Sequence, residues 1–135
     1  MKDNKKKILI LGSTGMLGSE VLKVFSDLDN YKIFTNLRNL KQKKTFKINN
    51  LNKITFFKFD AKINNINELK RYITRDTIII NCIGKDIYTS KNRKKTIFAN
   101  AEIPSLIYNA GSNSGVKYFI FISTYHVYDF NKKKI

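Results

Sequence analysis

The sequence is poor in several features, and each scarcity restricts what the protein can be. It has one cysteine, Cys82, which sits in an apolar run, cannot form an internal disulfide and is expected to pack as a small buried hydrophobe. No apolar run approaches the roughly 18 residues of a membrane-spanning helix. The N-terminal MKDNKKK lacks the apolar core of a signal peptide. We therefore expect a single cytoplasmic domain that neither crosses a membrane nor depends on disulfides.

Acidic residues are also scarce, because 10 Asp and Glu face 26 Lys and Arg, for a formal net charge of +16. Such an excess suggests nucleic-acid binding, since clustered basic side chains neutralise phosphates. However, only Arg38, Arg71, Arg75 and Arg93 are arginines, and the lysines are spread from Lys2 to Lys134. Frequent asparagine and isoleucine indicate A- and T-rich codons. We favour a solvated lysine surface, with a polyanion-binding surface as the alternative.

Apolar runs predict strands at residues 6–11, 31–37, 54–59, 77–83 and 117–123, the last two of the type that is buried on both faces. Helical periodicity predicts a helix from Leu17 and further helices at 65–75 and 96–112, with Pro104 as a kink or an early-turn residue. The lysine-rich stretch 38–53 has no period and is predicted to be a long, mobile loop. The expected inward residues are Leu17, Val21, Val24, Phe25 and Leu28, then Ile66, Leu69 and Ile73, and finally Ile103, Leu106, Ile107 and Ala110.

Strands that alternate with helices predict an α/β fold with a doubly wound, Rossmann-like parallel sheet of about five strands. Three glycines, Gly12, Gly15 and Gly18, join the first strand to the first helix. In that position glycines allow a tight turn, a close approach of backbone to a pyrophosphate, and close helix-to-strand packing. The spacing G-x-x-G-x-x-G is neither the G-x-G-x-x-G of many dehydrogenases nor the G-x-x-x-x-G-K-[ST] of nucleotide triphosphatases. We therefore predict a dinucleotide cradle, with a purely structural turn as the alternative.

The end of the second strand bears on which dinucleotide is bound. NAD-selective sites place an acid there for the ribose 2′-hydroxyl, whereas an arginine suits the 2′-phosphate of NADP. This segment reads NLRN, with Arg38 and no acid. The sequence therefore favours NADP as cofactor, with NAD still possible.

Five ordered motifs resemble the extended short-chain dehydrogenases/reductases, within them the NAD-dependent epimerase/dehydratase and dTDP-4-dehydrorhamnose reductase group. They are LGSTGMLGSEV, the FDA that contains Asp60, NCIG, the ANAEIP around Asn100, and FISTYHVYD at 121–129. The resemblance covers nearly the whole chain. It implies an oxidoreductase or epimerase acting on a nucleotide sugar, with no metal site. It also implies that Asp60 and Ala61 lie beside adenine and that backbone at 82–84 lines the cofactor.

The same resemblance assigns Thr124 as the catalytic hydroxyl that hydrogen-bonds the substrate's reacting oxygen, flanked by Tyr125 and His126. Local backbone hydrogen bonds at a strand end are the alternative for Thr124. The complete set of expected cofactor-binding residues is Gly12, Thr14, Gly15, Met16, Leu17, Gly18, Arg38, Asp60, Ala61, Cys82, Ile83 and Gly84.

One expected family feature does not occur at its usual place. The family's general acid/base tyrosine, with a lysine four residues on, normally follows the Ser/Thr by a dozen or more residues, and we regard Tyr128 with Lys132 as a chance match. Residues 1–135 are thus expected to form an incomplete NAD(P)-binding domain without the substrate lobe, which binds NADP(H) without full catalysis. The alternatives are a non-catalytic NADP-binding regulator and a basic nucleic-acid-binding Rossmann domain.

Overall fold

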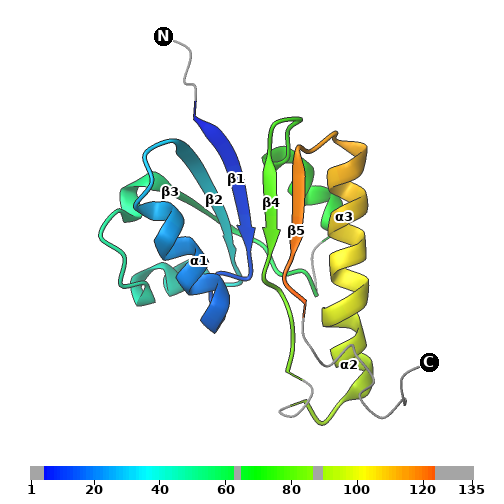
Figure 1. Ribbon diagram of the computed structural model, residues 1–135. Helices are drawn as coiled ribbons and strands as arrows, with labels where there is room; N and C mark the ends of the chain where they lie inside the picture. The colour runs from blue at the N-terminus through cyan, green and yellow to red at the C-terminus, as the bar shows by residue number, and fades with distance from the viewer. Residues whose placement is uncertain (1–4, 63–64, 87–89, 124–135) are drawn as a thin grey trace, which may run out of the picture.

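The computed structural model describes residues 5–62, 65–86 and 90–123. Five parallel strands form one sheet in the order β3-β2-β1-β4-β5, so the strand order reverses between β1 and β4 (Figure 1). This topology confirms the predicted Rossmann-like α/β fold. The strands are β1 (Lys6–Leu11), β2 (Tyr31–Leu37), β3 (Ile54–Lys58), β4 (Ile78–Asn81) and β5 (Tyr118–Phe121).

Helix α1 (Met16–Ser26) covers one face of the sheet, over β1 and β2. Its buried residues are Gly18, Leu22 and Ser26, and Leu22 packs among the isoleucines of the strands. The expectation that Leu17, Val24 and Leu28 face inward is wrong, because they are 47%, 60% and 41% exposed. The stripe that packs on the sheet contains Gly18, Leu22 and Ser26, whereas the more apolar stripe with Leu17 and Val24 is exposed.

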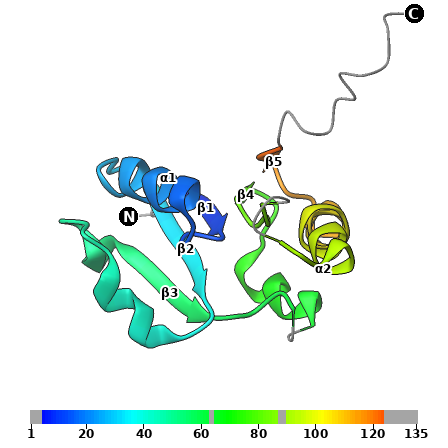
Figure 2. The same ribbon diagram turned by 90° about the horizontal axis from the view of Figure 1, so that it is seen from below.

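The opposite face is covered by α3 (Ile103–Asn113) and the 3-10 helix η3 (Ile66–Tyr72) (Figure 2). The predicted inward direction is confirmed for the buried residues Leu69, Ile73, Ile103, Ile107 and Ala110. Leu106 is an exception, at 46% exposed, and the segment predicted as 65–75 forms a 3-10 helix, not an α-helix. The hydrophobic core between this face of the sheet and the helices has the buried residues Leu9, Leu11, Phe57, Phe59, Leu69, Ile73, Ile79, Ile103, Ile107 and Ala110.

The predicted helix 96–112 is part of a longer helical run. It begins as α2 (Arg93–Ile97), passes through one π-helical segment, η4 (Phe98–Glu102), and continues as α3. Pro104 stands in the first turn of α3, directly after the π-helical segment. It therefore lies in an early turn of α3 but inside the longer run, which begins at Arg93.

The stretch 38–53 is not the irregular loop that its composition predicts. It holds two 3-10 helices, η1 (Leu40–Thr45) and η2 (Leu51–Lys53). Asn39 and Gln42 form a capping box at the start of η1. Gln42 Oε1 accepts a hydrogen bond from Asn39 N at 3.1 Å, and Asn39 Oδ1 accepts one from Lys41 N at 3.0 Å. Local polar capping thus supplies order that hydrophobic periodicity does not reveal.

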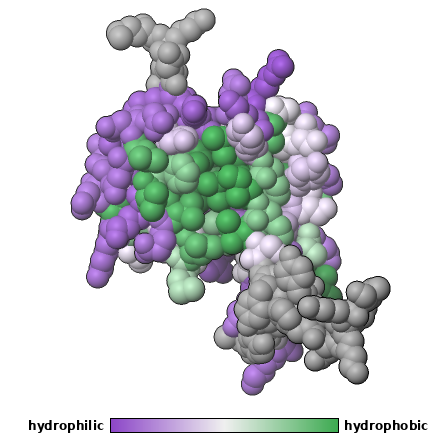
Figure 3. Space-filling model, in the orientation of Figure 1, coloured by the Kyte–Doolittle hydropathy of each residue, from purple (hydrophilic) through white to green (hydrophobic). Residues whose placement is uncertain are grey.

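β5 is not buried on both faces, contrary to expectation. On the α1 side of the sheet Tyr118 and Ile120 are 56% and 44% exposed, since α1 covers β1 and β2 and does not reach β5. Figure 3 shows the resulting apolar surface between the α1 region and β5. Among the described residues, none of the helices is long and apolar enough to span a bilayer.

Candidate functional site

The glycine loop leaves β1 and enters α1 at the carboxyl edge of the sheet. Gly12 has φ +83°, the left-handed region, and its carbonyl accepts a hydrogen bond from Gly15 N at 3.1 Å. Gly15 is the N-cap of α1, and no acidic side chain stands in the first turn of the helix. The first N–H groups of a helix lack intrahelical partners, so the loop presents donors and a positive dipole end to this edge.

Each glycine of the loop answers a different steric demand. A Cβ on Gly12 would meet the backbone of Cys82 and Ile83 at 2.8 Å, so the loop after β1 lies against the loop after β4. A Cβ on Gly18 would meet the Gly12 carbonyl carbon at 2.8 Å, so α1 sits directly on the turn. Gly15 is exposed, and a Cβ there would meet only Gly12 O, at 3.4 Å. The first and third glycines serve packing, and the second keeps the surface of the turn bare.

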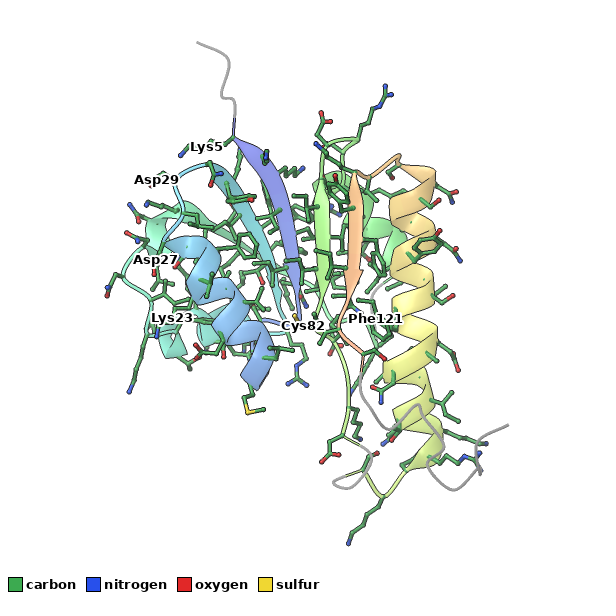
Figure 4. The ribbon with its side chains drawn as sticks, viewed as in Figure 1. Lys5, Lys23, Asp27, Asp29, Cys82 and Phe121 are labelled. Atoms are coloured by element: carbon green, nitrogen blue, oxygen red, sulfur yellow. The ribbon has the colours of Figure 1, made fainter. Side chains whose placement is uncertain are left out.

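A pocket of about 330 Å³ opens beside this turn, at the carboxyl ends of β1, β2, β3 and β4. We refer to it as the edge pocket. Its volume lies within the range of small-molecule sites, and its position at the reversal of strand order is where open α/β sheets bind ligands. Figure 4 shows Cys82 and Phe121 together at that edge of the sheet, at the ends of β4 and β5. The lining residues are Gly12, Thr14, Gly15, Asn36, Arg38, Asp60, Ala61, Lys62, Cys82, Ile83, Gly84, Lys85, Ala99 and Ile103.

Nine of the twelve residues predicted to bind cofactor line the edge pocket. The other three, Met16, Leu17 and Gly18, lie in the first turn of α1 and do not line it; Met16 is 89% exposed. Thr124, like Tyr128 and Lys132, lies outside the described residues. The nine are Gly12, Thr14, Gly15, Arg38, Asp60, Ala61, Cys82, Ile83 and Gly84.

Sequence reasoning missed Asn36, Lys62, Lys85, Ala99 and Ile103, which also line the edge pocket. Lys62 directly follows the FDA motif after β3, and Lys85 directly follows the NCIG motif after β4, which is the signal that could have found them. Asn36 could have been found as a polar residue inside an otherwise apolar strand end. The pocket thus carries three cationic side chains and one acid, Asp60, a balance that suits an anionic ligand.

Two further features of the pocket concern its chemistry. Burial raises the pKa of the Cys82 thiol, which therefore stays protonated near neutral pH and contributes an apolar wall. Asp60 Oδ1 accepts a hydrogen bond from Lys62 N at 3.0 Å, which fixes the turn after β3. The described residues contain no group of His, Cys, Asp and Glu that could hold a metal ion.

The sheet order, the glycine turn against α1 and the pocket at the switch point define a Rossmann-type dinucleotide-binding domain. The residues fit such a ligand, because the bare backbone at Gly15 leaves room that a side chain would fill. The family model of the NAD dependent epimerase/dehydratase family matches residues 8–134. The chain belongs to this family, as its motifs predicted.

Solved structures with the same fold include two UDP-sugar 4-epimerases and an oxidoreductase. The UDP-Glc/GlcNAc 4-epimerase of Campylobacter jejuni is 22% identical, with a TM-score of 0.78 over 95% of this chain and 40% of its own. UDP-glucuronic acid 4-epimerase from Bacillus cereus, in complex with NAD and a UDP-sugar analogue, is 16% identical, with a TM-score of 0.74 over 96% of this chain and 43% of its own. The oxidoreductase ylbE of Lactococcus lactis is 25% identical, with a TM-score of 0.68 over 93% of this chain and 52% of its own.

The chain spans about two fifths to a half of the length of these structures. No curated protein sequence matches it.

Proposed function

We propose that the chain binds NADP(H) in the edge pocket, in preference to NAD(H), as the cofactor-binding portion of an enzyme that acts on nucleotide sugars. The observation that carries the proposal is the position of Arg38. It lies just after β2, lines the same pocket as the glycine loop, and has no acidic residue beside it at that strand end. This is the place where a dinucleotide's 2′-hydroxyl or 2′-phosphate is read.

In this proposal the glycine turn and the N-terminus of α1 hold the pyrophosphate through backbone N–H groups. Arg38 donates to the 2′-phosphate, and Lys62 and Lys85 add positive charge around the pocket. Asp60 and Ala61 take the adenine side. The bound nicotinamide supplies hydride transfer, and the protein's part is to hold and orient it.

The substrate half of the proposal rests on family membership and on the printed names of the relatives, two of which are 4-epimerases of UDP-sugars. Thr124 as the hydroxyl that contacts the sugar stays a prediction from the sequence, because it lies outside the described residues. The cofactor half can be tested on the chain itself.

Calorimetric titration with NADP⁺ and with NAD⁺ tests the cofactor preference. We expect NADP⁺ to bind at least about tenfold more tightly, since a charge-assisted hydrogen bond contributes about 1.5–3 kcal/mol. Arg38→Ala should remove the difference between the two cofactors while leaving NAD⁺ affinity nearly unchanged.

The matched control is Arg75→Ala. Arg75 is exposed and precedes β4, so it lies at the opposite, amino edge of the parallel sheet. Its substitution therefore removes the same charge far from the edge pocket. Equal weakening by Arg38→Ala and Arg75→Ala would mean that net charge, not a 2′-phosphate contact, sets the affinity. An NAD⁺ preference in the unmodified chain would overturn the assignment of Arg38.

A further inference from the structure

Asn36 joins the carboxyl ends of three strands through one side chain. It lies near the end of β2 and is 7% exposed. Its Oδ1 accepts a hydrogen bond from Gly12 N, at the first glycine after β1, at 3.0 Å. Its Nδ2 donates to Phe59 O, just after β3, at 3.0 Å. A single buried amide therefore fixes both the glycine turn and the start of the loop that carries Asp60.

Asn100 does the same for the loop after β4. It lies in the π-helical segment η4, and its amide makes a reciprocal pair with the backbone of Lys85. Oδ1 accepts from Lys85 N at 2.7 Å, and Nδ2 donates to Lys85 O at 2.8 Å. A Cβ on Gly84 would come within 3.4 Å of Asn100 Oδ1, so the loop runs close against the helix at this point. π-helical turns often occur where a helix serves a site.

We propose that Asn36 and Asn100 are positioning residues of the edge pocket, and that their amides hold its three loops in the conformation that binds the dinucleotide. The inference rests on the proposed cofactor binding. Each amide meets one backbone donor and one backbone acceptor, and only a side chain with both functions satisfies the two. An apolar side chain would leave both backbone groups unpaired, and a carboxylate would place its lone pairs against a carbonyl oxygen.

Asn36→Asp turns this requirement into a pH-dependent measurement. When ionised, the new carboxyl still accepts from Gly12 N but repels Phe59 O. When protonated, it has a donor and an acceptor, as the amide has. Because residue 36 is only 7% exposed, we expect a carboxyl at this site to have a pKa above its ordinary value. The binding-competent protonated form is therefore present at low pH and is lost as the pH rises through that raised pKa.

The measurement is the dissociation constant for NADP⁺ by calorimetry from pH 5 to pH 8, expressed as the ratio of variant to unmodified chain. The ratio cancels the titration of the ligand's own phosphate, which is the same for both proteins. Arg38, Asp60 and Lys62 are the charged residues that line the same pocket as position 36. We expect Asn36→Asp to bind about tenfold or more weakly at pH 8 and within about threefold at pH 5. Thermal melts at each pH identify the conditions in which the variant is folded.

Asn39→Asp is the charge-matched control. Asn39 lies three residues further along and is exposed, and its hydrogen bonds among residues 5–62, 65–86 and 90–123 lie within η1 and its cap. A carboxyl there stays ionised over this pH range, so its ratio should not change with pH. Asn100→Asp is the second test variant. Its site is only partly buried, so burial alone does not predict recovery at low pH, and its readout is the affinity at pH 8. We expect Asn100→Asp to bind NADP⁺ about tenfold more weakly than the unmodified chain at pH 8, where Asn39→Asp should bind nearly as tightly.

The possible outcomes separate the two proposals. If the unmodified chain does not bind NADP⁺, the proposed function fails. If it binds, the positioning role is overturned when the ratio of folded Asn36→Asp is as flat with pH as that of Asn39→Asp, or when Asn100→Asp binds NADP⁺ at pH 8 as tightly as Asn39→Asp does. Recovery at low pH by Asn36→Asp and weakened binding by Asn100→Asp at pH 8, with a flat Asn39→Asp control, support it.

Discussion

Two glycines three residues apart in the loop respond to the same substitution in different ways. A Cβ on Gly18 would meet the backbone of Gly12 and Ser13 at 3.0 Å or less, with no flexible side chain to give way. Gly18→Ala must therefore push α1 away from the turn. Overpacking of this kind costs about 1–3 kcal/mol, which lowers the melting temperature of a domain of this size by roughly 3–10 °C.

Gly15→Ala meets no such obstacle. Gly15 has φ −79° and ψ 164°, an extended conformation that alanine adopts, and the added Cβ would meet only Gly12 O, at 3.4 Å. Alanine is a poorer N-cap than glycine, so we expect a loss of stability below about 1 kcal/mol. The new methyl group nevertheless enters the edge pocket, and we expect NADP⁺ affinity to fall at least about tenfold, with Gly15→Val weaker still.

The assay pairs urea denaturation of each variant with calorimetric titration of NADP⁺. The reasoning predicts a crossed pattern: Gly18→Ala loses mainly stability, whereas Gly15→Ala and Gly15→Val lose mainly cofactor affinity. A folded Gly15→Val variant that binds NADP⁺ as the unmodified chain does would refute the cradle.

Two further predictions concern the core and the cysteine. Ile107→Ala should lower the free energy of unfolding, measured by urea denaturation, by about 2–5 kcal/mol, because Ile107 is fully buried. Ile120→Ala should lower it by less than half as much, because Ile120 is 44% exposed. Equal losses would show that the β5 face is covered. Because burial raises the pKa of Cys82, its alkylation by iodoacetamide at pH 7.5 should be slower than that of free cysteine, should accelerate as the pH rises, and should slow further with NADP⁺ present. A rate equal to that of free cysteine, unaffected by NADP⁺, would contradict this.

The strands and their order could be predicted because their signals are local and strong. Continuous apolar runs bounded by turns predicted five strands, and the structure has all five within a few residues of the expected bounds. The glycine loop predicted the pocket because Gly12 and Gly18 are required by close contacts between backbone segments. Such contacts do not depend on which side chains surround them.

The face of α1 could not be read from periodicity alone, since the more apolar stripe of this helix, with Leu17 and Val24, is not the one that packs on the sheet. Leu17, Val24 and Leu28 fit a helical period as well as Gly18, Leu22 and Ser26 do. The third glycine was the available signal. If Gly18 must touch the turn, then the residue one turn further, Leu22, must face the sheet.

Asn36 and Asn100 were missed as site residues for a related reason. Their contribution lies in bonds to the backbone of segments 24 and 15 residues away, and single-sequence patterns do not show which polar residue reaches which loop. The exposure of β5 was missed because an apolar run reports the character of the strand, and not whether a helix covers both of its faces.

The most direct test of the central claim is to locate the cofactor on the chain by NMR. Amide chemical shifts of a ¹⁵N-labelled sample would be followed during titration with NADP⁺ at moderate salt. We expect the largest changes at residues 12–18, at Arg38, and at residues 60–62 and 82–85, with the amino edge around Lys6 and Asp76 unchanged. Shifts spread over the lysine-rich surface, or confined to the amino edge, would contradict the assignment of the edge pocket as the dinucleotide site.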